Sequence, residues 1–145
     1  MKKFRKGIFA VIFIKNKKPK FLIFHRIKNW RGWEFLKGGL EGSEDEIKCL
    51  EREIAEETGA KKYRIFKTKY RIKYKWPRNY IKDKHKFLGA EGRLFIVQLF
   101  SKRIKIDRNE HDKFKWVDAK EAFKYLTYLN LRNALKYVLR NHKLS

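Results

Sequence analysis

The chain is poor in acidic residues and in cysteine, and its first apolar run is short. Its 145 residues include 39 Lys and Arg, 16 Asp and Glu, and one cysteine. One cysteine excludes a framework of internal disulfides. The run at residues 7–14 cannot span a bilayer, and charged residues follow it instead of the small residues of a cleavage site. We therefore expect a cytoplasmic protein that has no membrane partner.

The rest of the composition is that of a globular protein with a basic surface. Hydrophobic residues make up 43% of the chain and aromatic residues 16%, which is enough to build a core at this length. No repeat or linker divides the sequence, so we expect one domain over residues 1–145. The formal net charge of +23 favours polyanionic partners, which include nucleotides, RNA and DNA.

The scarce acidic residues are concentrated in one segment. Residues 41–57 hold eight carboxylates and two basic residues, a local charge of −6, whereas the other 128 residues hold 37 basic and eight acidic residues, or +29. Carboxylates at this density repel one another unless a cation lies among them. Mg²⁺ and Mn²⁺ prefer such oxygen ligands and share their coordination with substrate phosphates. The segment therefore predicts a site for Mg²⁺, or Mn²⁺ as its substitute, and a phosphate-containing substrate.

Five segments have the patterns of β-strands. Apolar runs predict strands at residues 7–14, 20–25, 93–100 and 113–117. Residues 66–76 alternate instead: Lys or Arg stands at every odd position from 67 to 75, and Thr, Tyr, Ile or Trp at every even position from 68 to 76. This alternation predicts a strand with one basic face and one packed face.

Capping signals predict three helices. Ser43 followed by Glu46 forms a capping box and Gly59 is a C-terminal stop, which together predict a helix over residues 44–58. The double glycine at residues 38–39 indicates a tight loop before this helix. The same signals predict two further helices, one from Asp118 through Tyr125 and one that opens at Asn130. Strands mixed with helices indicate an α/β or α+β sandwich.

The first predicted helix presents three carboxylates on one side. At about 100° per residue, Glu53, Glu56 and Glu57 lie within roughly 100° of arc, next to an arc of apolar residues. A solvated acidic face is the usual explanation of such a charge run, and the angular positions alone do not exclude it. Cys49, on the same helix, is interpreted as a packing residue rather than a nucleophile.

The spacing of these residues resembles the signature of the Nudix hydrolase superfamily. The positions that carry the resemblance are Gly38, Glu44, Arg52, Glu53, Ile54, Glu56, Glu57 and Gly59. Ala60 departs from the pattern, because the family usually has a larger aliphatic residue there. The resemblance implies a Nudix-type α/β/α sandwich with a mixed β-sheet between helices. It also implies hydrolysis of a nucleoside diphosphate that is linked to another group.

The resemblance further implies roles for individual residues. Glu53, Glu56, Glu57 and the backbone carbonyl of Lys37 would be metal ligands, Arg52 would orient Glu53, Glu44 would support the loop, and Gly38 would let the backbone approach the metal. Outside the signature, residues 110–117 resemble the segment that supplies an extra glutamate in bacterial RNA pyrophosphohydrolases. Glu110 is therefore a candidate metal ligand or general base. An ordinary charged loop is the alternative explanation for Glu110.

Looser resemblances bear on the substrate. Residues 33–40 are similar to the approach to the signature in dinucleoside polyphosphate hydrolases and their RNA-decapping relatives, with Leu36 where a proline is usual. Parts of residues 74–99 resemble the central strands of the same branch. They favour a polyphosphate substrate over ADP-ribose or a damaged nucleoside triphosphate, and a dinucleoside polyphosphate such as diadenosine tetraphosphate is the first candidate. Removal of pyrophosphate from triphosphorylated RNA 5′ ends is the second candidate, and a catalytically silent nucleic-acid-binding module on the same fold is the third.

Charge outside the signature indicates which residues bind the substrate. Residues 61–88 hold twelve Lys or Arg, seven aromatic residues and one acid, a mixture that can bind phosphates and stack on bases. Arg26 and Lys37, which flank the predicted loop at Gly38 and Gly39, are candidate contacts to the outer phosphates. Tyr80 is a candidate platform for a base. The alternative is that most of these cations are simply solvated.

Overall fold

The structure is a computed structural model that describes residues 3–77 and 87–144, in which a seven-stranded sheet carries three helices. The strands are β1 (Lys3–Ile14), β2 (Lys20–Arg26), β3 (Gly32–Glu34), β4 (Leu36–Gly39), β5 (Tyr63–Lys75), β6 (Phe87–Leu99) and β7 (His111–Val117). The helices are α1 (Glu46–Thr58), α2 (Ala119–Tyr125) and α3 (Leu129–Asn141). The strand order is β3-β2-β1-β6-β5, with β4 paired to β1 and β7 paired to β2.

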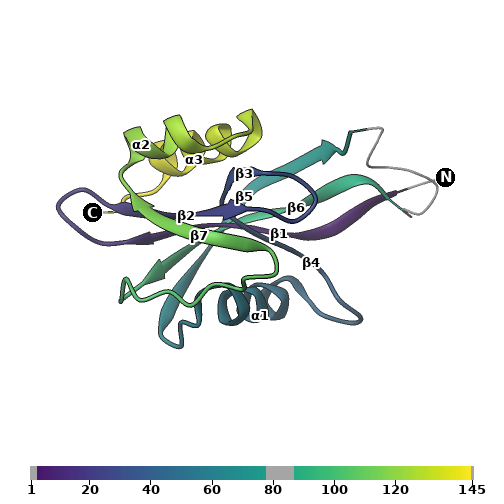
Figure 1. Cartoon of the computed structure of the whole chain (residues 1–145), viewed down its shortest axis with the longest axis horizontal. Helices are drawn as coiled ribbons and strands as arrows, with labels where there is room; N and C mark the ends of the chain where they lie inside the picture. The colour runs from purple at the N-terminus through teal and green to yellow at the C-terminus, as the bar shows by residue number, and fades with distance from the viewer. Residues whose placement is uncertain (1–2, 78–86, 145) are drawn as a thin grey trace.

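The sheet lies between helices on both faces (Figure 1). Helix α1 covers one face, and α2 and α3 cover the other. β1 and β6 run parallel, and the other paired strands run antiparallel. The predicted α/β/α sandwich with a mixed sheet is therefore confirmed.

The second half of strand β1, residues 7–14, is apolar without interruption because it is buried on both faces. The even-numbered residues of 8–12 pack on the α1 side with Leu50 and Ile54, whereas the odd-numbered residues of 9–13 pack on the other side with Leu135. A strand that is buried on both faces has no polar alternation, because each side chain enters a core. The apolar run thus places β1 at the centre of the sandwich.

The start of α1 differs from the prediction. The helix begins at Glu46, and its N-cap is Asp45, whose side chain accepts a hydrogen bond from the backbone N–H of Lys48 at 2.8 Å. The predicted capping box at Ser43 and the predicted start at Glu44 are therefore wrong. Asp45 and Ser43 have equal intrinsic capacity to cap a helix, and the choice follows from Glu44, which is engaged in ion pairs described below.

Two glycine predictions have different outcomes. Gly59 ends α1 in the left-handed conformation, with φ 71°, as predicted. Gly38 and Gly39 do not form a tight loop: they end strand β4, where they pair with Ile8 and Gly7. A Cβ atom on Gly7 would overlap the carbonyl oxygen of Gly38, so the glycines permit a close approach of two strands.

The five predicted strands are present, but β1 and β6 begin earlier than predicted, at Lys3 and Phe87, and the short strands β3 and β4 were not predicted. The helices after β7 follow the predictions more closely. Asp118 caps α2 in a capping box with Glu121, as expected. α3 begins at Leu129, one residue before the predicted start, and Tyr128 makes no side-chain cap. In β5, the odd-numbered cations are exposed, whereas Thr68 and Ile72 are buried. No helix among the described residues is long and apolar enough to cross a membrane.

Candidate metal and phosphate site

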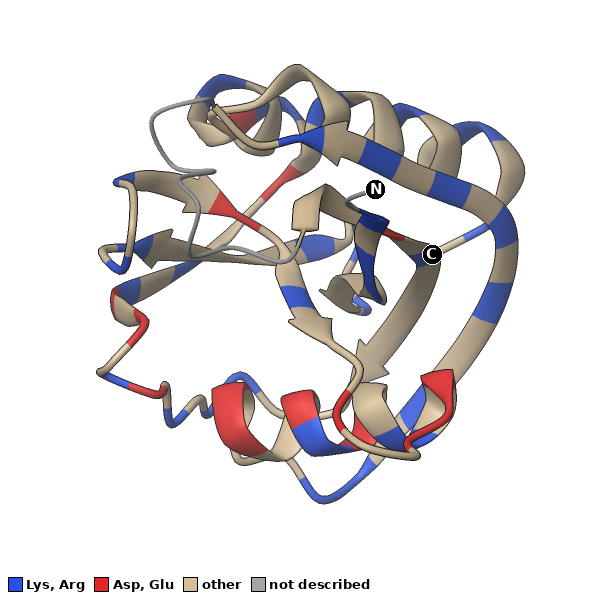
Figure 2. Cartoon of the chain, turned by 90° about the vertical axis from the view of Figure 1, so that its right-hand side faces the viewer, with Lys and Arg blue, Asp and Glu red and all other residues tan. Residues whose placement is uncertain are grey.

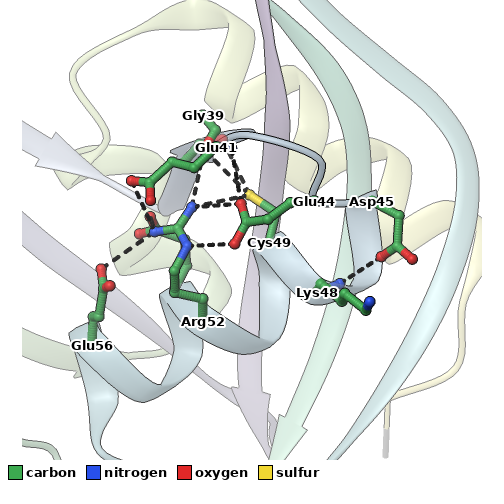
Figure 3. A network of polar contacts seen from close by, with 10 residues as sticks. Gly39, Glu41, Glu44, Asp45, Lys48, Cys49, Arg52 and Glu56 are labelled. Carbon is green, nitrogen blue, oxygen red and sulfur yellow. Dashed lines mark hydrogen bonds and ion pairs between the residues drawn. The ribbon is translucent and has the colours of Figure 1, made fainter.

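Arg52 joins three parts of the chain at the exposed side of α1 (Figure 3). Its guanidinium donates to the carboxylate of Glu44 at 2.7 and 3.0 Å, to the carbonyl of Gly39 at 3.0 Å and to Glu53 at 2.8 Å. The carboxylate of Glu56 lies 3.5 Å away. The hydrogen bond to Arg52 lowers the pKa of Glu44 to about 2. Arg52 therefore ties the end of β4 and the following loop to the helix.

Gly38 brings the backbone of β4 against a carboxylate. A Cβ atom at Gly38 would overlap the carboxyl group of Glu53, so the position has room for glycine alone unless Glu53 moves. Glu53 is 7% exposed, which shows how closely β4 covers it. The end of β4 thus lies directly against Glu53, and the carbonyl of Gly39 accepts a hydrogen bond from Arg52 beside it.

Gly38→Ala is expected to weaken divalent metal binding about tenfold, because the added methyl group displaces the Glu53 carboxyl from its place beside Arg52. Titration with Mn²⁺ measures the change. Gly42→Ala is the control, since a Cβ at Gly42 meets no atom within 4 Å; its φ of 53° costs some stability without disturbing the site. Equal metal affinity in wild type and Gly38→Ala would contradict the assignment of Glu53 to the metal site.

A second group of carboxylates forms where the loop before β7 meets the end of α1. Glu57 is 1% exposed, and its ligand atoms lie within 4.8 Å of those of Glu110 and His111. The two ring nitrogens of His111 lie 2.9 Å from Glu57 and 2.8 Å from Glu34. Both nitrogens are thus engaged by carboxylates, so we assign the metal-binding capacity to Glu57 and Glu110 rather than to the imidazole.

The raised pKa values of these carboxylates favour the binding of a cation. Burial raises the pKa of Glu53 to about 7, although Arg52 opposes the change. Burial also raises the pKa of Glu57, against the hydrogen bond from His111, and the neighbouring Glu110 raises it further. Buried carboxylates that repel one another in this way fit a divalent ion, which would be held by Glu53, Glu57 and Glu110 with the more exposed Glu56 beside them.

Metal affinity is expected to rise about tenfold between pH 6 and pH 8. The metal-free Glu53 has a pKa of about 7, so at pH 6 an incoming ion must displace a proton that is absent at pH 8. Calorimetric titration with Mg²⁺ in two buffers of different ionisation enthalpy measures both the affinity and the proton release. In Glu53→Gln the dependence on pH should largely disappear; a wild-type affinity that is constant over this range would contradict the explanation.

A buried charge cluster that sequence reasoning missed lies behind the site. Glu34 is 1% exposed and accepts hydrogen bonds from Arg26 at 3.1 Å and from His111 at 2.8 Å. The ammonium of Lys37 lies 3.4 Å from its other oxygen, an ion pair without hydrogen-bond geometry. Burial alone would raise the pKa of Glu34, but Lys37, His111 and Arg26 together lower it. The signal in the sequence was a single acid between Trp33 and Phe35.

Arg26 and Lys37, the predicted phosphate contacts, are therefore held in place by Glu34. Lys37 also donates to the hydroxyl of Tyr74 at 3.2 Å. The cations lie 5.9 Å (Arg26) and 5.5 Å (Lys37) from the centroid of Trp30, whose ring meets Tyr128 edge-on at 4.9 Å.

Tyr80, the predicted base platform, lies outside the described residues. Trp30 was not singled out in the sequence, and it is the aromatic ring that the structure brings to the two cations.

Cys49 has the packing role that was expected. It is fully buried, and burial raises the pKa of its thiol to about 12. A thiol with such a pKa is not a nucleophile at neutral pH. Its sulfur lies 3.6 Å from the carbonyl of Gly39, beneath the Arg52 network.

Comparisons with known proteins agree with this geometry. A NUDIX domain family model matches residues 3–141. The RNA pyrophosphohydrolase of Pelagibacter ubique is 29% identical over 93% of each chain, and that of Ruthia magnifica is 31% identical over 91% of this chain and 82% of the relative.

Solved structures show the same fold at low identity. The Ap4A hydrolase of C. elegans, in a binary complex, has a TM-score of 0.76 and 22% identity, and covers 94% of this chain and 96% of its own. The E. coli dihydroneopterin triphosphate pyrophosphohydrolase has a TM-score of 0.78 and 19% identity over 97% of this chain and 99% of its own. With the family model over nearly the whole chain and a relative above 30% identity, the chain belongs to the Nudix hydrolase family.

Proposed function

We propose that this Nudix hydrolase is a Mg²⁺-dependent enzyme that removes pyrophosphate from the 5′ end of triphosphorylated RNA. The observation that carries the proposal is the meeting of Glu57 and Glu110 beside Glu53, with the cations Arg26 and Lys37 on the adjoining strands. Carboxylates alone would repel a polyphosphate. Carboxylates that hold a metal ion beside fixed cations suit phosphoric anhydride hydrolysis.

The residues divide the chemistry between them. A bound Mg²⁺ would neutralise charge on the phosphates and lower the pKa of water. Glu53, Glu57 and Glu110 would hold it, and a carboxylate of this group would take the proton from the attacking water. Lys37 and Arg26 would contact outer phosphates while Glu34 keeps them in position. Trp30 is the candidate platform for the first base.

The relatives and the sequence patterns rank the substrates differently. The sequence resemblance as a whole puts dinucleoside polyphosphates first, with diadenosine tetraphosphate as the leading example, although residues 33–40 resemble both branches. The curated relatives that match over most of the chain are named RNA pyrophosphohydrolases, which favours RNA. A dinucleoside polyphosphate is therefore the second candidate. Both substrates present the same chemistry, a phosphoric anhydride attached to a nucleoside, and a cytoplasmic location would give access to both.

A substrate panel tests the proposal. Triphosphorylated RNA, diadenosine tetraphosphate and ADP-ribose are each incubated with the protein, with and without Mg²⁺, and products and kcat/KM are measured. We expect Mg²⁺-dependent release of pyrophosphate or phosphate from RNA with the highest kcat/KM. A higher value for the dinucleotide would reverse the order of the two candidates, and a preference for ADP-ribose would overturn both. No turnover of any substrate, with RNA still bound, would support the catalytically silent module.

A further inference from the structure

Strand β5 is the edge of the sheet on the side away from β2 and β3, and it carries a row of cations. Lys67, Lys69, Arg71, Lys73 and Lys75 are all exposed, and their bands follow one another along the strand in Figure 2. At roughly 3.3 Å per residue the row extends over about 25 Å. We call these five side chains the β5 row.

Few acidic residues lie near the β5 row. Between Thr58 and Lys75 the sequence has no acidic residue. Glu91 faces Lys73 across the ladder between β5 and β6, and no ion pair joins any of the five cations to a described residue. Lys73 is placed over the ring of Phe4 at 4.4 Å. A row of exposed cations that form no ion pairs raises the local concentration of a flexible polyanion.

The opposite face of β5 fixes the orientation of this row. Thr68 and Ile72 are buried, and the ring of Tyr70 packs on Tyr137 of α3 at 4.7 Å. Since side chains alternate between the two faces of a strand, the odd positions lie on the opposite face, and there they are exposed. The cations thus belong to one rigid element and share one side of it.

The C-terminal end of the β5 row lies next to a residue that contacts Lys37. Tyr74 lies between Lys73 and Lys75, and its hydroxyl accepts a hydrogen bond from Lys37 at 3.2 Å. Lys37 in turn pairs with Glu34 beside His111. Tyr74 lies on the face of β5 that α2 and α3 cover, and the row lies on the other face. An RNA that leaves the metal site past Lys37 would therefore reach the C-terminal end of the row, at Lys73 and Lys75, around the free edge of the sheet.

We infer that the β5 row binds the single-stranded body of an RNA whose 5′ end lies in the site. This inference rests on the proposed function, because a free dinucleotide is too short to occupy both places. The row offers phosphate contacts and no base-reading groups, so binding should be independent of sequence and sensitive to salt. The partner of the surface is therefore the ribose-phosphate backbone beyond the first nucleotides.

The direct test uses a 12-nucleotide RNA with a 5′-hydroxyl group, which cannot be a substrate. Its affinity is measured by fluorescence anisotropy at several salt concentrations, for wild type and for the triple variant Lys67→Gln, Lys69→Gln, Arg71→Gln. Single strands lose affinity with a logarithmic slope of about −0.7 per phosphate contact, so the triple variant should reduce the magnitude of the slope by about 2. We expect at least tenfold weaker binding at low salt.

The matched control removes the same charge elsewhere. Lys15→Gln, Lys17→Gln, Lys18→Gln changes three exposed lysines in the loop between β1 and β2, which does not border β5. We expect RNA affinity within about threefold of wild type for this control. An equal loss of RNA affinity in both triple variants would show an effect of net charge alone and overturn the inference. Unchanged RNA affinity in both variants would overturn it as well. Melting temperatures verify folding, and Arg71→Gln alone is the substitute if the triple variant melts early.

Kinetics separate the inference from the proposed function. In the β5 triple variant, kcat/KM for triphosphorylated RNA should fall by more than kcat/KM for diadenosine tetraphosphate, and the fall should appear mainly in KM. If the 5′-hydroxyl RNA binds the β5 row but triphosphorylated RNA is not hydrolysed, the proposed function fails and the surface stands. If RNA is hydrolysed equally well by both triple variants, the function stands and the surface fails.

Discussion

Glu57→Gln is expected to lower kcat/KM by about 10³ on whichever polyphosphate the enzyme prefers. Glu57 is 1% exposed and lies against Glu110 and His111, so the substitution keeps the shape of the side chain and removes one charge from the metal site. A single group that stabilises charge in the transition state is worth 10²–10³ in rate, and loss of metal adds to this. Initial rates over a range of Mg²⁺ concentrations measure the effect, and Mn²⁺ binding followed by electron paramagnetic resonance reports the metal separately.

Glu51→Gln is the control for this substitution. Glu51 lies on the same helix, is exposed and forms no ion pair with a described residue. The activity of Glu51→Gln should therefore remain within about twofold of wild type. Glu57→Gln with more than a third of wild-type activity would remove Glu57 from the site. Loss of activity with unchanged Mn²⁺ affinity would give Glu57 a role as base instead of ligand.

Glu34→Gln is expected to lower the free energy of unfolding by about 3 kcal/mol, or the melting temperature by about 10 °C. The amide fits the same space but leaves Arg26, Lys37 and His111 without their shared negative partner. Removing one partner of a buried ion pair is costly because the remaining charges stay desolvated. Activity should also fall, since Lys37 and His111 lose the group that positions them. Urea unfolding at pH 6.5 gives the change.

The pH dependence of stability follows from the same cluster. Burial opposes the charged form of His111, but its hydrogen bonds to Glu34 and Glu57 raise its pKa to about 9. A pKa raised in the folded state contributes stability that is fully present below the unfolded value of about 6.5 and is lost as the pH rises through about 9. Wild type should therefore lose on the order of 3 kcal/mol between pH 6.5 and pH 9.5 from this group.

Glu34→Gln should show a smaller loss over the same pH range, because His111 then keeps one of its two carboxylate partners. Glu46→Gln is the matched control: it breaks the half-exposed ion pair with Arg93 at 3.3 Å and should cost less than about 1 kcal/mol. An unfolding free energy for Glu34→Gln that equals that of the control would show that the buried cluster contributes nothing to stability. If the unfolding free energy of Glu34→Gln depended on pH as that of wild type does, a group other than His111 would account for the pH dependence.

Local signals explain what could be predicted. The helix that carries Arg52, Glu53, Glu56 and Glu57 was found because its periodicity and its terminal glycine lie within one segment. The strands and the alternation of β5 were found for the same reason. The start of α1 was wrong because Asp45 and Ser43 are both good caps, and Glu44 was committed to Arg52 by a contact that only the folded chain makes.

The sequence by itself determined the α/β class, the acidic helix face and the family signature, because each depends on residues that are near neighbours along the chain. Only the tertiary structure brought Glu110 and His111 to Glu57, and Glu34 to Arg26 and Lys37. Those contacts depend on the pairing of β7 with β2 and of β2 with β3. The register of these strands is set by packing over the whole sheet. A buried carboxylate needs its cations at hydrogen-bond distance, and that distance is a property of the fold.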